Sequence, residues 1–489
     1  MLPSALARRA RSLLVPLLLS AAGLAAWPAV AGEQADRAVA AVRRLVAAGE
    51  IRPGTTLQLG FKQGNVNAFL GRELELQKEW EHQTGVLLNA RIVPQQPVAH
   101  LLREPNAIDL TVARNHEYPD LVADGLIEDL TPLFAEFGFD LDERPRDAFI
   151  RPALQARLGQ RIVAVPADGD VAILYLRRDL MQDPDEQAAF RKATGRALTP
   201  PATWQEYEEL VRFFDRPAHG LYGAAEERDP DGAWMYWLIR YLSQDAPYQP
   251  LFDARMRPLL DSPAGIAATE SYVAAVRHAP PDATEAGKDY NFTVPLFAQG
   301  KAFATIVTIA GARIFNAEGS AVRGRFMAVP LPGQRHAGQV VRRTTVIYGN
   351  NLVIPRVAAN RKLAFLYAMW LTDPDISARS IGVPGGFADP YRWSHLHDPR
   401  IAAVYGTPAL EVFAREWSVA LPPGTGLPGD GEYLAALDRD LTAAARGEMS
   451  PQQAMAATAR AWEAITERLG RAAQIRHWLA FTAGFEVAR

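Results

Sequence analysis

The sequence predicts an α/β protein with two or three domains or one two-lobed body, and three observations lead to this expectation. Segments that alternate like β-strands and segments with helical periodicity follow one another along the chain. Of the 489 residues, 48% are hydrophobic and 22% are charged, which is ordinary for a folded globular protein. After residue 31, no segment offers the roughly eighteen uninterrupted apolar residues that a membrane-spanning helix needs.

Charge and cysteine content exclude several classes of protein. The 52 Lys and Arg residues are balanced by 55 Asp and Glu residues, so we expect no nucleic-acid partner. The chain has no cysteine, which excludes thiolate metal sites, iron–sulfur clusters, cysteine nucleophiles and disulfides. The motifs of P-loop nucleotide hydrolases, HExxH zinc proteases and GxSxG serine hydrolases are absent. We therefore expect a protein without catalysis and without a tightly bound cofactor or metal.

The N-terminus has the pattern of a secretory signal peptide. Arg8, Arg9 and Arg11 precede the apolar run 13–27, and Ala29-Val30-Ala31 provides small residues for cleavage after Ala31. The run is too short and too rich in Ala and Gly to favour the alternative, a membrane anchor. We expect export to the periplasm, and the sequence leaves the export route, Sec or twin-arginine, open.

The first part of the mature chain predicts parallel βαβ units. Residues 33–50 form a short amphipathic helix, and strands are predicted at 55–61, 87–93 and 108–113, with a helix that ends at Gly85. Ligand crevices of such sheets lie outside the carboxyl ends of the strands. The turns at 62–67 and 114–118 follow strands in this way and are the first candidate ligand loops.

The remainder of the chain continues the alternation of strands and helices. Strands are predicted at 162–165, 171–176, 303–309 and 346–354, and helices at 203–214, 233–243, 362–371 and from Ser450 onward. Two of these helices begin with a capping box. The segment 421–432, rich in Gly and Pro, is expected to be a long surface loop. The His-Leu-His-Asp segment 395–398 is expected to be a solvated loop in preference to a metal site.

A series of short motifs points to a known family. They lie at 79–86 (EWEHQTGV), 108–112 with 123–130 (IDLTV and ADGLIEDL), 165–180, 297–302 (FAQGKA), 330–333 (PLPG), 364–373 and 447–454 (GEMSPQQA). Each motif is weak alone, but their common order resembles the extracellular solute-binding proteins (family 1) of ABC importers, which include maltose-type sugar-binding proteins. The resemblance extends from about residue 53 to 469.

This resemblance implies a type II periplasmic-binding-protein fold. Each of two lobes would be a mainly parallel sheet flanked by helices, and hinge crossings near 165–167 and 329–346 would join the lobes. The expected organisation is a signal peptide at 1–31, a lead-in helix at 32–52, a first lobe at 53–166 and 346–400, a second lobe at 167–335 and 408–469, and a C-terminal tail at 470–489.

The function that the resemblance implies is capture of a sugar, oligosaccharide or polyol between the lobes and delivery to ABC permease subunits at the inner membrane, by a monomer. Ten residues are the expected ligand contacts: Gln63, Asn65, His116, Glu117, Asp170, Trp234, Tyr236, Asn350, Phe387 and Asp389. Four of them also have a structural alternative: Trp234 and Tyr236 as core residues, Asn65 as a turn residue and Asp170 as a cap or brace of the crossing.

Other functions remain open at this point. An exported carbohydrate hydrolase with paired carboxylates is one, because such a pair is defined by distance in space. A binding protein for a non-sugar or an anionic, phosphorylated solute is another, since Lys62 and Arg114 lie in the candidate ligand loops. A third is a sensor that binds solute and signals.

Overall fold

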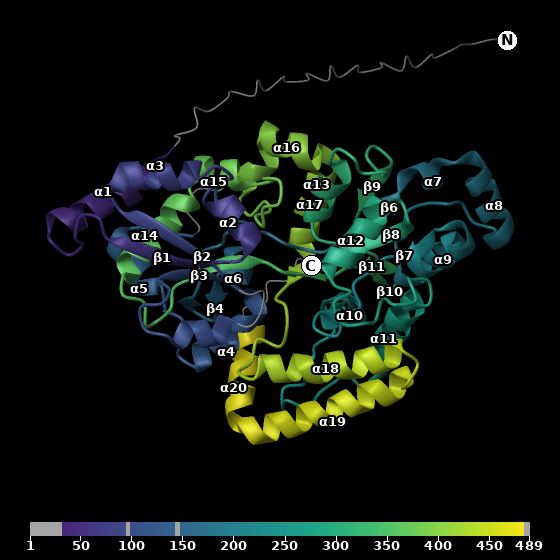
Figure 1. Ribbon diagram of the computed structural model, residues 1–489. Helices are drawn as coiled ribbons and strands as arrows, with labels where there is room; N and C mark the ends of the chain where they lie inside the picture. Colours follow the sequence, from purple (N-terminus) through teal and green to yellow (C-terminus); the bar gives the residue numbers. More distant parts are fainter. Residues whose placement is uncertain (1–31, 94–97, 142–146, 484–489) are drawn as a thin grey trace, which may run out of the picture. The chain divides into compact units, whose positions relative to one another are not determined.

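The computed structural model describes residues 32–93, 98–141 and 147–483 (Figure 1). Residues from Gly32 onward form one compact unit. The predicted signal peptide, 1–31, lies outside the described residues. Among the described helices, none has both the length and the apolar character needed to cross a membrane.

The first sheet has the order β13-β3-β1-β2. Its strands are β1 (Thr56–Phe61), β2 (Leu87–Ile92), β3 (Leu110–Arg114) and β13 (Asn350–Val353). Strand β1 pairs in parallel with β2 and β3, whereas β13 pairs antiparallel with β3. The mainly parallel sheet expected for the first lobe is confirmed, and a segment nearly 240 residues downstream (350 minus 114 is 236) closes one edge of it.

The second sheet has the order β7-β8-β6-β9. Its strands are β6 (Ile173–Arg177), β7 (Tyr222–Ala224), β8 (Ala302–Val307) and β9 (Phe326–Val329). Strand β6 is antiparallel to both β8 and β9, so the expectation of a mainly parallel second sheet is wrong. The cause is that β6, like β13, enters its sheet directly from the other sheet, and no crossover helix turns the chain back to give a parallel strand.

Helices surround both sheets, and the remaining short strands pair with one another in two-stranded sheets. The α-helices are α1 (Glu33–Ala47), α2 (Gln63–Phe69), α3 (Glu75–Thr84), α4 (Tyr118–Ala123), α5 (Thr131–Phe137), α6 (Pro152–Gln155), α7 (Arg178–Gln182), α8 (Pro184–Thr194), α9 (Trp204–Phe214), α10 (Ala233–Leu242), α11 (Pro263–Val276), α12 (Tyr290–Ala298), α13 (Ala310–Asn316), α14 (Arg361–Leu371), α15 (Pro374–Ser380), α16 (Pro399–Tyr405), α17 (Thr407–Val419), α18 (Asp430–Ala445), α19 (Pro451–Leu469) and α20 (Arg471–Thr482). The 3₁₀ helices are η1 (Val98–Arg103), η2 (Asn115–Glu117), η3 (Pro217–His219) and η4 (Trp393–His397), and the short strands are β4 (Arg157–Leu158), β5 (Arg161–Ile162), β10 (Gln334–His336), β11 (Gln339–Val341), β12 (Thr344–Thr345) and β14 (Ala420–Leu421).

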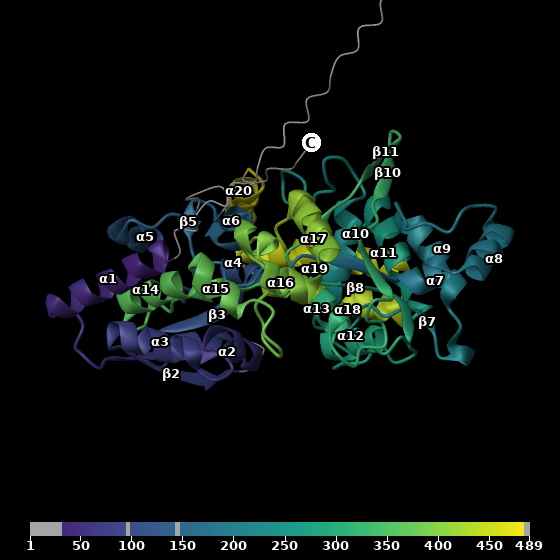
Figure 2. The same cartoon turned by 90° about the horizontal axis from the view of Figure 1, so that it is seen from above.

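The N-terminal helix is part of the first core. Helix α1 lies beside α14, as both views show (Figures 1 and 2). Its Ala38 and Val42 are fully buried in the apolar cluster that also holds Trp370 of α14. A separate apolar cluster surrounds the second sheet and includes Trp462 of α19 and Trp478 of α20. The tail is therefore helical as far as Thr482, and Trp478 packs against Phe252 with ring centroids 5.4 Å apart.

Helix starts are where local sequence predicts best. The capping boxes of α9 and α19 are present, with Thr203 paired to Glu206 and Ser450 paired to Gln453. The helix expected to end at Gly85 is broken into α2 and α3, and Gly71 and Leu74 between them have φ values of 82° and 58°. Lys62 and the residues after it, expected as a turn, precede and begin α2.

One expected surface loop is largely buried, and one residue of another is buried. In the Gly- and Pro-rich segment 421–432, Thr425 is fully buried and donates its backbone N–H and its hydroxyl to Asp430. The ring of Phe481 on the C-terminal helix region covers Gly426. His395 is also buried, and its Nε2 lies 2.8 Å from the Ser377 hydroxyl. Polar composition predicted exposure in both segments, whereas side-chain hydrogen bonds make burial possible.

A buried glutamate in α17 makes stability depend on pH. Glu416 is 1% exposed and accepts a hydrogen bond from the Leu331 N–H at 3.1 Å. Burial raises its pKa to about 8, so the folded protein keeps a proton that the unfolded chain loses near pH 4. Its contribution to stability is complete below about pH 4 and is lost as the pH rises toward 8, at about 1.4 kcal/mol per unit.

We therefore expect that the free energy of unfolding of Glu416→Gln falls less steeply with pH than that of the wild type. The difference should appear between roughly pH 5 and 8, where Glu416 titrates. Urea denaturation followed at several pH values measures the slope. Glu411→Gln, at an exposed position of the same helix, is the control and should retain the wild-type slope. Identical slopes for all three proteins would contradict the prediction.

Candidate functional site

Two chain segments run between the sheets next to each other. Val165 and Leu352 exchange two backbone hydrogen bonds of 2.9 Å, and Val171 forms a bridge with Val346. The N–H of Ile347 also donates to the carbonyl of Asp170 at 3.1 Å. The crossing expected near 165–167 is thus joined to a second crossing at 346–352. This second crossing begins at the last residue of the range 329–346 that was expected for it.

A cavity of about 330 Å³, called cavity 1, opens beside these crossings. Both crossings contribute to its wall, together with Arg114 and Asn350 of the first sheet and Thr308, which directly follows β8 of the second. Its ionisable lining is mainly acidic and consists of Asp168, Asp170, Glu227, Asp229, Asp231, Asp289 and Asp389, with Arg114 and Arg313 as the cations. Seven carboxyl groups against two guanidinium groups give cavity 1 a negative character.

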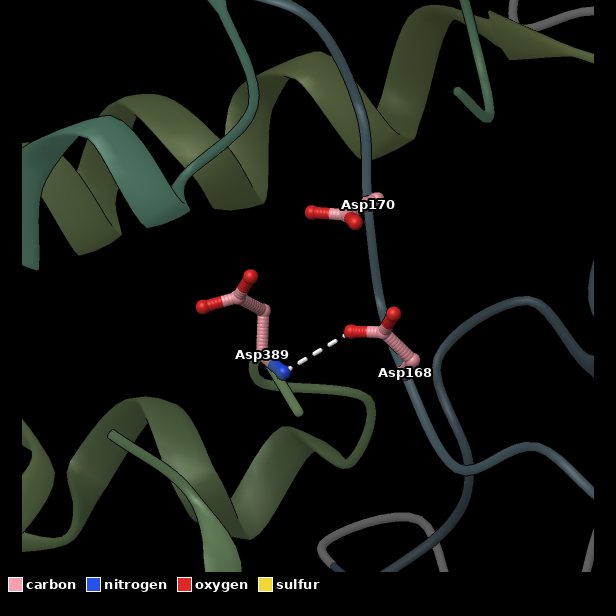
Figure 3. A group of neighbouring side chains, drawn as sticks. All are labelled: Asp168, Asp170 and Asp389. Carbon is pink, nitrogen blue, oxygen red and sulfur yellow. Dashed lines mark hydrogen bonds between the residues drawn. The ribbon is translucent and has the colours of Figure 1, made fainter. Parts of the chain in front are cut away.

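Three of these carboxyl groups converge (Figure 3). Asp168 and Asp170 come from the first crossing and Asp389 from the loop after α15, and one oxygen of each lies within 4.8 Å of the others. Asp168 accepts hydrogen bonds from the N–H of Asp389 at 2.9 Å and from the backbone and side-chain nitrogens of Asn350 at 3.2 and 3.1 Å. The Tyr405 hydroxyl donates to Asp389 at 2.5 Å. We call Asp168, Asp170 and Asp389 the aspartate cluster.

Glycine at position 169 makes the aspartate cluster possible. A Cβ atom added to Gly169 would lie 2.0 Å from the backbone oxygen of Pro390. The first crossing can therefore approach the 389–391 segment only with glycine here, and that approach places Asp389 against Asp168 and Asp170.

Burial and mutual repulsion favour protonation in the aspartate cluster. Burial and the Asp389 carboxylate raise the pKa of Asp168 to about 7, in spite of its three hydrogen bonds. Burial and both neighbours raise the pKa of Asp170 well above its usual range, and burial also raises that of Asp389. Such a cluster can share a proton, bind a cation or offer oxygen ligands to a metal ion.

A second acidic wall comes from the loop after β7. The Tyr348 hydroxyl contacts Glu227, whose pKa burial raises to about 7. Asp229 accepts the backbone N–H groups of Asp231 and Gly287, so it orders this loop. Asp289 caps the start of α12 by accepting the N–H of residue 291. These carboxylates hold backbone in place and line the cavity at the same time.

The basic groups near cavity 1 have defined contacts. Arg114 places its guanidinium 5.0 Å from the ring centroid of Tyr348. Arg313, on α13, donates to the carbonyl of Gly386 at 3.2 Å. Lys62 is buried and donates to Asn350 Oδ1 at 2.7 Å, and burial together with Arg114 lowers its pKa to about 8. Lys62 thus orients the amide that binds Asp168.

Three aromatic rings complete the wall: Tyr290, Tyr348 and Phe387. The rings of Tyr290 and Tyr348 meet edge to face at 6.2 Å. The Phe387 backbone is fixed by α2, since its carbonyl accepts from Asn65 Nδ2 at 2.8 Å and its N–H donates to the carbonyl of Gly64 at 2.9 Å. Aromatic faces of this kind pack against the C–H side of a ligand or against a cation.

A second cavity of about 600 Å³, called cavity 2, lies toward α18. His116 and Trp234 are part of its lining, with ring centroids 5.2 Å apart. Burial and Arg114 lower the pKa of His116 to about 3, so its imidazole is neutral. The backbone N–H of Trp234 donates to Asp438. Because Trp234 is only 3% exposed, it is largely a core residue at the edge of cavity 2.

The ten expected contact residues fall into three groups. Asp170, Asn350, Phe387 and Asp389 line cavity 1, and His116 and Trp234 line cavity 2. The other four line neither of these cavities: Gln63 is exposed at the start of α2, Asn65 holds the Phe387 loop, Glu117 accepts the Arg114 N–H at 2.6 Å, and Tyr236 is buried 3.5 Å from Glu227. The candidate site is therefore centred on the crossings.

Several lining residues were not among the expected contacts. Asp168 carried a signal, because it precedes Asp170 in the same Asp-Gly-Asp turn. Glu227 and Asp229 belong to the run Glu-Glu-Arg-Asp at 226–229, whose acidic and basic residues together signal internal pairing. Tyr290, Arg313 and Tyr348 carried no comparable local signal, since their positions depend on how the second sheet packs.

Comparison with known proteins identifies the family. The model of the family described as bacterial extracellular solute-binding protein matches residues 107–378. The chain belongs to this family. A member of an extracellular family functions in the periplasm or outside the cell. No curated protein matches the chain at a significant level.

Solved structures share the fold. A solute-binding protein of Agrobacterium radiobacter K84 in complex with ribitol is 22% identical, with a TM-score of 0.66 over 84% of this chain and 99% of that one. Maltose-bound MalE3 of T. maritima is 18% identical, with a TM-score of 0.68 over 84% and 100%. A protein of Agrobacterium vitis S4 with bound D-mannitol is 17% identical, with a TM-score of 0.66 over 85% and 99%. At these identities the likeness shows the two-lobed α/β fold.

Proposed function

We propose that this solute-binding protein captures a sugar or polyol in cavity 1 and delivers it, chemically unchanged, to the permease of an ABC importer. The observation that carries the proposal is the composition of cavity 1, where aromatic rings and buried hydrogen-bonding groups meet at the crossings. Proteins of the same fold have been solved with ribitol, D-mannitol and maltose.

The size and position of cavity 1 support a small solute. About 330 Å³ is at the lower end of ligand pockets, which favours a monosaccharide or an acyclic polyol over a long oligosaccharide. Asn350 and Phe387 approach the cavity from the side of the first sheet, and Tyr290 and Arg313 from helices of the second. A solute that contacts both groups favours the arrangement in which they are close, which is how a ligand shifts a conformational equilibrium.

The acidic lining argues against an anionic solute. A phosphate ester in cavity 1 would face seven carboxyl groups and two guanidinium groups. Lys62, which the sequence offered as a phosphate ligand, is engaged with Asn350. Like charges at short distance are unfavourable, so phosphorylated solutes should bind more weakly than their neutral counterparts.

The contacts of the aspartate cluster also argue against a hydrolase. A general acid needs a carboxyl group that reaches the substrate. Both oxygens of Asp168 already accept hydrogen bonds, from Asp389 and Asn350, and Asp389 binds Tyr405. Of the three, Asp170 alone keeps a buried oxygen without a partner among the described residues, whereas glycoside hydrolysis uses a pair of carboxyl groups. The family consists of binding proteins, and we propose that this chain likewise has no catalytic activity, that it acts as a monomer and that its leader is cleaved after Ala31.

A thermal-shift screen of neutral sugars, polyols and their phosphate esters on protein that begins at Gly32 tests the proposal. At least one neutral compound should raise the melting temperature, since a ligand that binds only the native state stabilises it. Asn350→Ala should abolish the shift, and His397→Ala, at an exposed position outside the cavity, should retain it. Absence of any shift, or recovery of the compound as a cleaved or oxidised product, would contradict the proposal.

A further inference from the structure

We propose that the solute carries a protonated amine that binds against Asp170, so that cavity 1 selects an aminated sugar or aminated polyol over the neutral counterpart. This inference rests on the proposed function, because it specifies the solute of the same cavity. Three features of cavity 1 support it: the donors and acceptors of its lining, the contacts of the individual carboxylates, and the aromatic wall.

The lining of cavity 1 offers an excess of acceptors. An ionised carboxylate only accepts hydrogen bonds, whereas a sugar hydroxyl both donates and accepts. A neutral polyol needs donors from the protein for its acceptor oxygens, and besides Arg114 and Arg313 the lining offers the hydroxyl groups of Tyr290 and Thr308, against seven carboxyl groups. An ammonium group has three donors and no acceptor, so it matches a wall of seven carboxyl groups better than a hydroxyl does.

Among these carboxylates, Asp170 is the one with an unused atom that is buried. Asp168 accepts three hydrogen bonds, and Asp229 and Asp289 accept backbone N–H groups. Asp170 is 5% exposed, and its Oδ1 has no hydrogen-bond partner among the described residues. A buried charged oxygen without a partner is costly, and a ligand cation removes that cost. Burial and the neighbouring carboxylates raise the pKa of Asp170, and a bound cation would favour its ionised form.

The surroundings favour an ammonium over a metal ion. Calcium requires six to eight oxygen ligands, so it would need most of the oxygens of the three carboxylates in the aspartate cluster. Amide donors already occupy both oxygens of Asp168. Arg313 supplies positive charge beside Asp389, which leaves less negative charge for a divalent ion. A single positive charge at Asp170 fits this balance.

The aromatic wall is suited to the same solute. Tyr290, Tyr348 and Phe387 line cavity 1 together with Asp170. The face of an aromatic ring attracts a cation, by about 0.5–2 kcal/mol, and also packs against the C–H groups of a sugar or polyol. An aminated carbohydrate presents both features in one small molecule.

Isothermal titration calorimetry with matched compounds tests the inference, at a pH at which the amines are protonated. The pairs are glucosamine with glucose, glucosamine with N-acetylglucosamine, and 1-amino-1-deoxysorbitol with sorbitol. In at least one pair the wild-type protein should bind the amine about 10- to 100-fold more tightly, as expected for a hydrogen bond to a charged group. Asp170→Asn should remove most of this preference, so that the amine and its neutral counterpart bind with affinities within about threefold of each other.

Asp398→Asn is the matched control, because Asp398 caps the exposed start of α16 and asparagine is an equally good cap. It should leave the preference intact. Equal affinity for amine and neutral compound overturns this inference and leaves the proposed function standing. Binding of neither class, together with no hit in the thermal-shift screen, overturns both. Calcium chloride that stabilises the wild type but not Asp170→Asn, without an amine preference, assigns the aspartate cluster to a metal instead. If Asp170→Asn does not fold, the wild-type ratio between glucosamine and N-acetylglucosamine decides.

Discussion

Replacement of Glu226 by glutamine is expected to lower the free energy of unfolding by about 3–5 kcal/mol, because it leaves two buried arginines without their counter-charge. Glu226, Arg228 and Arg240 are at most 2% exposed. Both oxygens of Glu226 lie about 3 Å from Arg240, at 3.0 and 2.9 Å, and Arg228 contacts it at 2.9 Å. Tyr207 donates a further hydrogen bond at 2.6 Å.

The pKa of Glu226 describes the strength of this network. Burial alone would raise it, but Arg228 and Arg240 overcome burial and lower the pKa to about 2. The stabilisation by this carboxylate is therefore complete above the pKa of the unfolded chain, near 4, and is lost as the pH falls toward 2. Acid denaturation of the wild type should include this step, and Glu226→Gln should lack it.

Glu186→Gln is the matched control for this prediction. Glu186 also forms a bidentate pair with an arginine, Arg216, but their side chains are 17% and 34% exposed. Pairs of this kind contribute about 0–1 kcal/mol, so the control should unfold near the wild-type urea concentration. Urea denaturation followed by tryptophan fluorescence measures both variants. A decrease of similar size in the free energy of unfolding of both variants would show that burial does not increase the contribution of the Glu226 network to stability.

Gly169→Ala is expected to weaken solute binding by at least about tenfold and to lower the free energy of unfolding by about 1–3 kcal/mol. The added methyl group would meet the Pro390 backbone oxygen at 2.0 Å, and backbone cannot rotate away as a side chain can. The first crossing and the 389–391 segment must then separate. This separation would disrupt the hydrogen bond between Asp168 and the Asp389 N–H, and with it the aspartate cluster.

Gly431→Ala provides the comparison for Gly169→Ala. Gly431 lies in the first turn of α18, and a Cβ atom there would lie 3.3 Å from a carboxylate oxygen of Asp120, a side chain that can move. Alanine also favours a helix more than glycine does. Melting temperatures and calorimetric affinities for the best compound of the screen measure both variants. Undiminished affinity in Gly169→Ala would show that the aspartate cluster does not contribute to binding.

Local sequence predicted the elements of this fold more reliably than their pairing. Capping boxes such as Thr203 with Glu206 depend on four consecutive residues, and the structure contains them. The direction of β6 within the second sheet depends on residues more than a hundred positions away, and the prediction of a mainly parallel sheet was wrong there. Hydrophobic periodicity identifies a strand but carries no information about its neighbours.

The candidate site shows the same division. Family position led to Asp170, and Asn350 and Asp389 were further expected contacts; the structure places all three at cavity 1. The sequence left open whether Trp234 is a ligand contact or a core residue, and in the structure it is largely a core residue at the edge of cavity 2. Helix α10 is buried on all sides, so the face of each aromatic residue cannot be predicted from their spacing. The burial of Glu227 depends on Tyr348, from a distant part of the chain, so no local pattern reveals it.

The paired crossings have a mechanical consequence. Backbone hydrogen bonds between Val165 and Leu352 join the two crossings, and a hydrogen-bonded pair of segments resists torsion more than a single segment does. Asp168, Asp170 and Asn350 lie on or beside these crossings, so a molecule bound in cavity 1 contacts the chain segments that join the two sheets. We infer that a small change of angle at the crossings moves the far ends of the two sheets by a much larger distance. Binding in cavity 1 would thereby alter the outer surface of the protein.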